Sequence, residues 1–307
     1  MSSESLLNAV TMALRISLMI AVGSHLSLAR ARPHKVEQQE NGPEITEKMN
    51  RSQASAGKHT QSRLPQYRVE GSGPLLVYIS GLDGTGELFF KQAPALTRSY
   101  RVVTFRSRDS GRFSYDDLAA DVAAIIRDVG EERATIVAES FGGGVALTFA
   151  LRYPAMVERL VIVNSFARFR GRVKIKLGIL FASAFPFWLT SVARKTANEA
   201  ALRADGVQSG DRRLFFKAIH TVKRESYTQR LKLIPQLDLE NRLVEINTPT
   251  LFIAGEKDML VPSAREARLM AARMPNAKVR LIPRAGHACL LGDRVRLADI
   301  LAEWTGQ

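Results

Sequence analysis

The side chain most able to do chemistry in this sequence is Ser140, at the centre of residues 138–144 (Ala-Glu-Ser-Phe-Gly-Gly-Gly). Small residues two positions before and two positions after it allow a sharp turn from a strand into a helix, which raises the hydroxyl above a sheet. The same turn places the Phe141 N–H at a helix N-terminus, where it can stabilise developing negative charge. The pattern predicts a nucleophilic serine, and the alternative is a serine that only caps a helix.

A serine hydroxyl is a weak nucleophile unless a base takes its proton. The chain has five histidines. His25, His34 and His59 lie in an N-terminal tail, and His220 lies in a basic insertion. His287 alone follows a run that looks like a core strand, so we expect it to be the base. The alternative is a structural loop histidine.

The base in turn needs a carboxylate that fixes its tautomer and stabilises its cation. The apolar run at 249–254 is followed directly by Gly255, Glu256, Lys257 and Asp258. We select Asp258 and keep Glu256 as its rival in the same turn. The alternative is that Asp258 only closes this turn.

Transfer of an acyl group also needs a second donor for the oxyanion. The loop at 80–84 follows the first apolar strand and contains Gly81, Leu82 and Gly84. We expect the Leu82 backbone N–H to be this donor, together with the N–H of Phe141. The alternative is that the glycines only make a tight turn.

The elements that must position these residues alternate along the chain from about residue 67. Apolar runs typical of strands occur at 74–80, 101–105, 134–138, 157–164, 249–254 and 278–282. Helical patterns occur at 114–129, 141–153, 263–273 and 293–304. Such alternation predicts an α/β fold with a doubly wound, mostly parallel sheet covered on both faces. Ser140, Asp258 and His287 each follow a strand of that sheet, in the chain order typical of a hydrolase built on it.

On these residues the chain from about 67 to 307 resembles the α/β-hydrolase superfamily. The resemblance rests on residues 80–82, 138–142, 255–258 and 286–287. Residues 81–86 and 139–142 are further similar to a group of esterase/lipase/thioesterase-like serine hydrolases, and some plant acyl-ester-forming relatives share the loop pattern. The resemblance implies a Ser–His–Asp triad, an acyl-enzyme intermediate and no cofactor. Two departures are Ala138, where glycine is usual, and Ser80, where many members have histidine.

The charge of the 307 residues is concentrated in one segment. The chain has 44 Lys and Arg against 30 Asp and Glu, a net charge of +14. Residues 165–235 hold 15 basic and 4 acidic side chains, whereas 67–164 and 236–307 together hold 21 of each. A single cysteine, Cys289, excludes an internal disulfide and a multi-cysteine metal site. We expect no metal ion, because no His/Asp/Glu cluster has ligand spacing.

The basic segment belongs to an insertion, 165–245, which we expect to form a helical cap between a first core part (67–164) and a second (246–307). It contains seventeen uncharged residues, 177–193, interrupted by Pro186. A central proline and this short length make a membrane span improbable. We expect its aromatic residues to bind substrate: Phe181, Phe185 and Trp188.

Two interpretations of the insertion's charge stay open. One is a cap with solvated charges. The other is an interfacial lid whose aromatic residues enter a lipid surface while the basic rim meets anionic head groups. Nucleic-acid binding is not expected, because the charges flank an apolar stretch and no nucleic-acid-binding pattern is present.

Residues 1–66 comprise an apolar segment followed by a polar linker, which we expect to be disordered. Three interpretations of the apolar segment stay open: an amphipathic or weakly spanning helix, a signal peptide if translation starts at Met12, or residues discarded by a start at Met49. The compartment depends on this choice. We expect a cytoplasmic or peripherally membrane-associated protein, or a secreted one with the Met12 start.

The sequence thus predicts a serine hydrolase that cleaves ester or thioester bonds of small-molecule or lipid substrates with an apolar acyl part. Two alternatives stay open. An acyltransferase would hand the same acyl-enzyme to an alcohol, and the difference lies in how water is excluded. A catalytically idle, membrane-docking protein would use the fold as a scaffold only.

Overall fold

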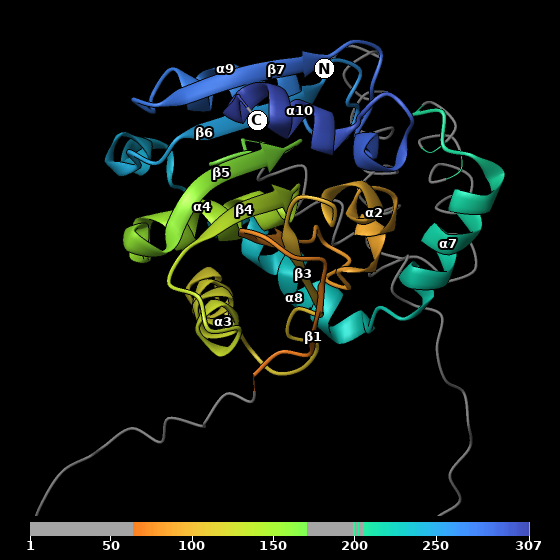
Figure 1. The fold of residues 1–307 in the computed structure, drawn as a ribbon, viewed down its shortest axis with the longest axis horizontal. Coiled ribbons are helices and arrows are strands. Elements are labelled where there is room, and N and C mark those ends of the chain that lie inside the picture. Colours follow the sequence, from red (N-terminus) through yellow and green to blue (C-terminus); the bar gives the residue numbers. More distant parts are fainter. Residues whose placement is uncertain (1–63, 171–198, 200–201, 203–204, 307) are drawn as a thin grey trace, which may run out of the picture. The chain divides into compact units, whose positions relative to one another are not determined.

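A computed structural model describes residues 64–170, 199, 202 and 205–306. All of them belong to one structural unit. Its centre is a seven-stranded sheet in the order β1-β3-β2-β4-β5-β6-β7, in which only the edge strand β1 is antiparallel to its neighbour (Figure 1). The strands are β1 (Tyr67–Glu70), β2 (Leu75–Ile79), β3 (Arg101–Phe105), β4 (Ala134–Glu139), β5 (Val157–Val163), β6 (Thr250–Gly255) and β7 (Ala277–Ile282).

Helices cover both faces of this sheet. The α-helices are α2 (Ala93–Leu96), α3 (Tyr115–Asp128), α4 (Phe141–Arg152), α7 (Ser209–His220), α8 (Arg224–Leu233), α9 (Ser263–Ala271) and α10 (Leu297–Thr305). Short 3-10 helices are η2 (Glu87–Lys91), η3 (Pro154–Met156), η4 (Ile234–Gln236), η5 (Glu240–Glu245) and η6 (Cys289–Leu291). The predicted α/β class with a mostly parallel, doubly wound sheet is therefore confirmed.

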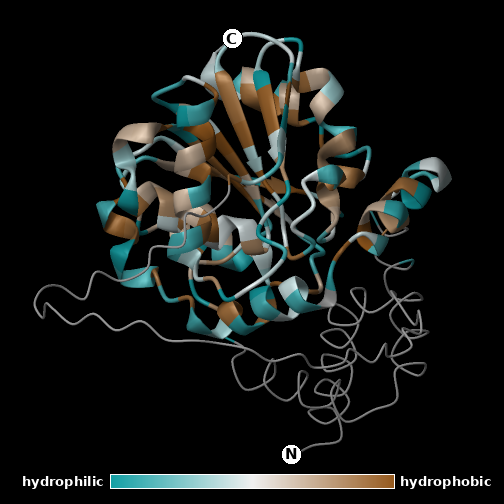
Figure 2. Ribbon diagram, turned by 90° about the horizontal axis from the view of Figure 1, so that it is seen from below, coloured by the Kyte–Doolittle hydropathy of each residue, from teal (hydrophilic) through white to brown (hydrophobic). Residues whose placement is uncertain are grey.

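Alternating side chains of the strands fill two separate cores. Val77 of β2 packs in one core with residues of α3, α4, α8 and α9. Its neighbour Tyr78 packs in the other core with residues of α2 and α10. Successive side chains of a strand point to opposite faces, so a strand buried on both faces is a continuous apolar run. Figure 2 shows this pattern as hydrophobic strands between helices of mixed hydropathy.

Most element boundaries fall within two residues of the sequence-based ranges, with two notable differences. The last helix, predicted at 293–304, begins only at Leu297. The sequence did not predict β1, a four-residue edge strand with a mostly exposed pattern, because it lacks the apolar run of the inner strands. The predicted start of α3 at Ser114 is confirmed, since Ser114 and Asp117 form a reciprocal capping box.

The insertion leaves the sheet after β5 and returns at β6, two strands that are direct neighbours. Its described part contains α7, α8, η4 and η5, and the expected cap over residues 165–245 stays a prediction. The uncharged stretch 177–193, and with it Pro186, lies outside the described residues, as do the N-terminal residues 1–63. Among the described helices, none has both the length and the apolarity needed to cross a bilayer.

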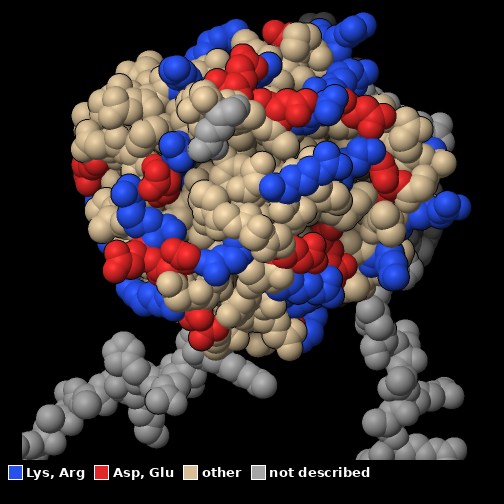
Figure 3. Space-filling view, in the orientation of Figure 1, with Lys and Arg blue, Asp and Glu red and all other residues tan. Residues whose placement is uncertain are grey.

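On the face shown in Figure 3, basic side chains lie among acidic ones rather than apart from them. At the start of the insertion, Arg170 pairs with Glu240 at 2.7 Å and with Glu266 at 2.8 Å. Arg168 lies 3.3 Å from Asp238. The first two arginines of the insertion are thus bound to carboxylates of the same chain.

Candidate active site

The turn between β4 and α4 holds Ser140 in a conformation that few non-glycine residues adopt. Its φ is 53° and its ψ is −119°. Helix α4 begins at the next residue and packs closely against the end of β2. A Cβ on Gly142 would lie 2.5 Å from the Ile79 carbonyl oxygen and 2.6 Å from that of Ser80, so only glycine fits there. Ala138 is fully buried at the position where glycine is usual.

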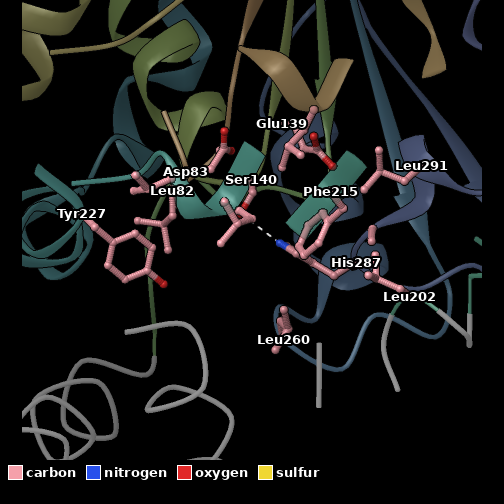
Figure 4. Close-up of a pocket in the computed structure, with 15 residues that line it drawn as sticks. Leu82, Asp83, Glu139, Ser140, Leu202, Phe215, Tyr227, Leu260, His287 and Leu291 are labelled. Carbon is pink, nitrogen blue, oxygen red and sulfur yellow. Dashed lines mark hydrogen bonds between the residues drawn. The ribbon is translucent and has the colours of Figure 1, made fainter. Parts of the chain in front are cut away.

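Ser140, His287 and Asp258 form one hydrogen-bonded chain. With the ring in the Nδ1–H tautomer, the Ser140 hydroxyl donates to His287 Nε2 at 3.0 Å and His287 Nδ1 donates to Asp258 Oδ2 at 2.7 Å. Figure 4 shows the imidazole directed at the serine. The structure therefore brings together the three side chains that the sequence selected from positions 140, 258 and 287. In this geometry a proton can pass from the hydroxyl to the ring.

The carboxylate of Asp258 is held by the turn that follows β6. Its Oδ1 accepts the backbone N–H groups of Leu260 at 2.9 Å and Val261 at 3.1 Å, and its Oδ2 accepts the Ser263 hydroxyl. The side chain has no solvent exposure. Glu256, the rival in the sequence, is exposed. The carboxylate that is hydrogen-bonded to His287 in the structure is therefore that of Asp258, and not that of Glu256.

The electrostatics of this pair favour a charged imidazole. Burial lowers the pKa of His287, but the charge and hydrogen bond of Asp258 together with the charges of Glu139 and Asp205 outweigh burial and raise the pKa above the ordinary 6.5. Burial likewise acts to raise the pKa of Asp258, yet His287 and the hydrogen bonds from Ser263 and Val261 bring it below its usual value. The carboxylate thus stays ionised and stabilises the cation that proton transfer creates.

The two predicted oxyanion donors lie beside Ser140. Phe141 is the first residue of α4, where a backbone N–H has no intrahelical partner. Leu82 lies in the loop after β2 and lines the same pocket as Ser140 and His287. In the part of the chain that the structure describes, neither N–H is paired with an acceptor. Their role in binding an oxyanion stays a prediction.

A pocket of about 140 Å³ opens beside Ser140 and His287. Most of its lining is apolar and comes from three regions: the loops after β2 and β6, the segment after His287, and the insertion. The insertion contributes Leu202, Phe215, Ile219, Val222 and Tyr227. The predicted substrate-binding residues Phe181, Phe185 and Trp188 lie outside the described residues.

The sequence did not single out a set of polar residues that surround the site. Asn164, just after β5, is buried with a φ of 47°. Its Nδ2 donates to the carbonyl oxygens of Gly286 and His287, both at 3.0 Å, and its Oδ1 accepts the Gly255 N–H at 2.8 Å. It therefore ties the histidine loop to the end of β6. The signal for it was its position directly after a strand, which it shares with Ser140.

A second missed residue is Glu139, next to the nucleophile. It accepts a hydrogen bond from the Tyr78 hydroxyl at 2.8 Å. Burial raises the pKa of Glu139 from 4.5 to about 7, against the opposing effect of the Tyr78 bond. In the described ranges no group of three or more His, Cys, Asp or Glu side chains is arranged to hold a metal ion.

Comparison with known proteins identifies the family of the chain. A family model described as the alpha/beta hydrolase fold matches residues 74–293, more than half of the sequence, and the chain therefore belongs to the α/β-hydrolase family.

Among curated proteins, the chain is similar to a candidate carbamate hydrolase RutD from Stutzerimonas stutzeri (strain A1501), with 29% identity over 263 residues, which cover 78% of this chain and 96% of that protein. The protein of the same name from Shigella flexneri is 27% identical over 234 residues, covering 72% and 86%.

Two solved structures have the same fold. A hydrolase from Pseudomonas aeruginosa PA01 superposes with a TM-score of 0.69 at 25% identity, covering 78% of this chain and 94% of that one. A candidate non-heme bromoperoxidase BpoC from Mycobacterium tuberculosis H37Rv gives a TM-score of 0.70 at 23% identity, covering 81% and 98%. The second likeness shows the fold alone.

Proposed function

We propose that the protein is a serine hydrolase that cleaves carboxylic ester or thioester bonds of substrates with an apolar acyl group. The observation that carries this proposal is the hydrogen-bonded chain from Ser140 through His287 to Asp258, with spacings of 3.0 Å and 2.7 Å. Such a chain activates a hydroxyl that would otherwise be unreactive. Ser140 and His287 line a mainly apolar pocket.

In the proposed reaction, Ser140 Oγ attacks the carbonyl carbon while its proton passes to His287 Nε2. The oxygen of the tetrahedral intermediate is stabilised by the N–H groups of Leu82 and Phe141. The carbon–oxygen or carbon–sulfur bond to the leaving group breaks, and His287 gives that group the proton. Water then attacks the acyl-enzyme by the same steps and releases the acid. Asp258 remains ionised throughout.

A short or medium acyl chain fits the part of the pocket that the structure describes. A cavity of about 140 Å³ is close in size to an engineered apolar cavity that holds benzene. Its apolar wall includes Leu202, Phe215 and Leu291. Because burial of each methylene contributes about 0.8 kcal/mol, activity should rise with chain length until the cavity is filled, at roughly six carbons.

The test is hydrolysis of p-nitrophenyl esters with acyl chains of increasing length, together with labelling by a fluorophosphonate probe. We expect the wild-type protein to be labelled and to cleave the esters. Ser140→Ala should lose labelling and about 10⁴-fold or more of kcat/KM. A Ser140→Ala variant that is as active as the wild type would refute the assignment.

Two further arms of the same assay separate related activities. Because the relatives are named as carbamate hydrolases, a carbamate is a second substrate class to test. Faster cleavage of an aryl carbamate than of the matched ester would favour carbamate hydrolysis. Added alcohol acceptor tests acyl transfer, because a transferase forms a new ester where a hydrolase forms the free acid. A protein that is neither labelled nor active would favour the idle scaffold.

A further inference from the structure

The buried carboxylate of Asp205, in the insertion, holds the loop of the proposed catalytic histidine. Only 2% of Asp205 is exposed. Its Oδ1 accepts the Gly286 N–H, and its Oδ2 accepts the Ala288 N–H at 3.1 Å. These amides flank His287 on both sides. Asp205 therefore fixes the N–H groups of a loop whose carbonyl groups are fixed by Asn164.

Two glycines of the His287 loop and the segment after it leave room for Asp205. A Cβ on Gly286 would lie 2.9 Å from an Asp205 carboxylate oxygen, and a Cβ on Gly292 would lie 2.3 Å from the Asp205 carbonyl oxygen. Neither glycine has a positive φ. Their lack of a side chain is thus required by the close approach of Asp205 and not by the turn itself.

A second buried charge of the insertion, Arg230 of α8, holds the loop that carries the other half of the site. Its guanidinium donates to three backbone carbonyls: Leu82 at 2.8 Å, Asp83 at 2.9 Å and Arg108 at 3.0 Å. Only 2% of the residue is exposed. A Cβ on Gly84 would lie 2.5 Å from the centre of this guanidinium, and the φ of +66° at Gly84 by itself also favours glycine.

Burial of the Asp205 and Arg230 charges is not explained by stabilisation of the fold alone. Transfer of an ion from water to a protein interior costs several kcal/mol, which backbone hydrogen bonds offset only in part. The cost is visible at Arg230, where burial lowers the pKa to about 10. Apolar side chains would fill the same space without it. What the two charges add is fixed geometry at the two loops beside Ser140.

We propose that Asp205 and Arg230 are positioning residues, through which the insertion fixes the His287 loop and the Leu82 oxyanion loop in their reactive arrangement. Asp205 holds the imidazole over Ser140 and adds negative charge beside it. Arg230 fixes the peptide units of Leu82 and Asp83, and so the direction of the Leu82 N–H. This inference rests on the proposed serine-hydrolase function.

The first test compares Asp205→Asn and Asp205→Glu in the full-length protein. Asparagine keeps the size but removes the charge and one acceptor. It should lower kcat by up to about a hundredfold, as expected for a misplaced catalytic group, with little change in KM. Because the carboxylates of Asp205, Asp258 and Glu139 all raise the pKa of His287, loss of one carboxylate should move the acid limb of kcat/KM to lower pH. Glutamate should lower kcat and leave that limb in place.

The second test is Arg230→Lys, which keeps the charge but not the planar set of donors. We expect a fall of about tenfold or more in kcat. The affinity for a trifluoromethyl ketone, whose serine adduct carries an oxyanion, should fall by a similar factor while KM stays nearly constant. A role in packing alone predicts no selective loss of affinity for the oxyanion.

Glu225→Gln and Lys232→Gln are the matched controls. Each removes one exposed charge from α8 of the same insertion, and each should keep wild-type kcat. Thermal unfolding of every variant identifies a loss of folding. If a variant at 205 or 230 is folded, labelled by fluorophosphonate at the wild-type rate and fully active, the assignment of that residue is overturned. A wild-type protein that is neither labelled nor active overturns the proposed function and this inference with it.

Discussion

Single residues of the site determine how its activity should depend on pH. His287 must be neutral to accept the Ser140 proton, and neighbouring carboxylates raise the pKa of its ring above 6.5. The cation is therefore favoured to a higher pH than in a free histidine. We predict that kcat/KM falls as pH decreases, with a midpoint above about 6.5. A pH–rate profile with a neutral ester measures this midpoint, and a midpoint well below 6 would contradict the electrostatic account.

Asp258 fixes the tautomer of His287 and stabilises its cation, and one substitution removes both effects without changing the packing. Asp258→Asn keeps the size of the side chain but favours the wrong tautomer of His287 and removes the charge that stabilises its cation. We predict a loss of about 10⁴-fold in kcat, which is the effect that the same change has in a serine protease. Glu256→Gln, in the same turn but exposed, is the control and should be nearly silent. Similar losses for both variants would contradict the assignment of Asp258.

Glu139 should make the stability of the fold depend on pH. Burial raises its pKa from 4.5 to about 7, so the folded state disfavours the charged form. The destabilisation begins as pH rises above 4.5 and is complete above about 7. We predict that Glu139→Gln, which still accepts the Tyr78 hydrogen bond, raises the free energy of unfolding at pH 8 by at most about 3 kcal/mol and changes it little at pH 5. Denaturant titrations at the two pH values measure the difference.

At the scale of elements, the close contact between α4 and β2 depends on Gly142. A methyl group there would meet two backbone carbonyl oxygens at 2.5 and 2.6 Å, neither of which can rotate away. We predict that Gly142→Ala destabilises the protein by about 1–3 kcal/mol and lowers activity, because α4 carries the Phe141 N–H. The measurement is a denaturant titration with an ester assay alongside.

Gly210→Ala is the matched control for this substitution. Gly210 lies in α7, and a Cβ there would meet nothing within 4 Å. Alanine in an open helical position should be neutral or stabilising by up to about 1 kcal/mol. Equal destabilisation by both substitutions would contradict the explanation from close packing.

The sequence predicted the inner elements because local patterns specify them. Strands buried on both faces appear as short apolar runs, and α3 begins at a capping box that four consecutive residues define. The edge strand β1 has no such pattern, since three of its four residues are exposed. Its place in the sheet follows from pairing with β3, which is distant in the sequence.

The predicted residues of the site differ from the missed ones in the same way: local patterns specify the first, and contacts between distant parts of the chain specify the second. Ser140, Asp258 and His287 lie in the turns or loops that follow sheet strands, so topology brings them to one edge. Asp205 and Arg230 reach that edge from an insertion, by packing that no local pattern encodes. The glycines at 84, 286 and 292 were visible in the sequence, but what approaches them was not.

At the scale of the whole molecule, the net charge of +14 is unevenly shared. The described residues hold 30 Lys and Arg against 25 Asp and Glu, whereas the remainder of the chain holds 14 against 5. In the described part, the arginines that begin the insertion are bound to carboxylates. The excess that could attract an anionic surface thus lies mainly outside the described residues.

We therefore propose that the full-length protein binds anionic lipid vesicles through basic residues of the sequence segment 172–195. Each basic residue near such a surface contributes about 1 kcal/mol, so Arg172→Gln, Lys174→Gln and Lys176→Gln combined should weaken binding by about a hundredfold. Cosedimentation with anionic and with neutral vesicles at increasing salt measures this effect. Equal binding to both kinds of vesicle would contradict it.

The adjacency of β5 and β6 has an evolutionary consequence. Because the chain departs from one strand and resumes in the strand beside it, segments of any length can be exchanged between these two points while the sheet stays intact. In this protein the exchanged segment would also have to supply a carboxylate in the place of Asp205 and a guanidinium in the place of Arg230. A chimera without them should keep the folded sheet but lose the fixed geometry of the two loops beside Ser140.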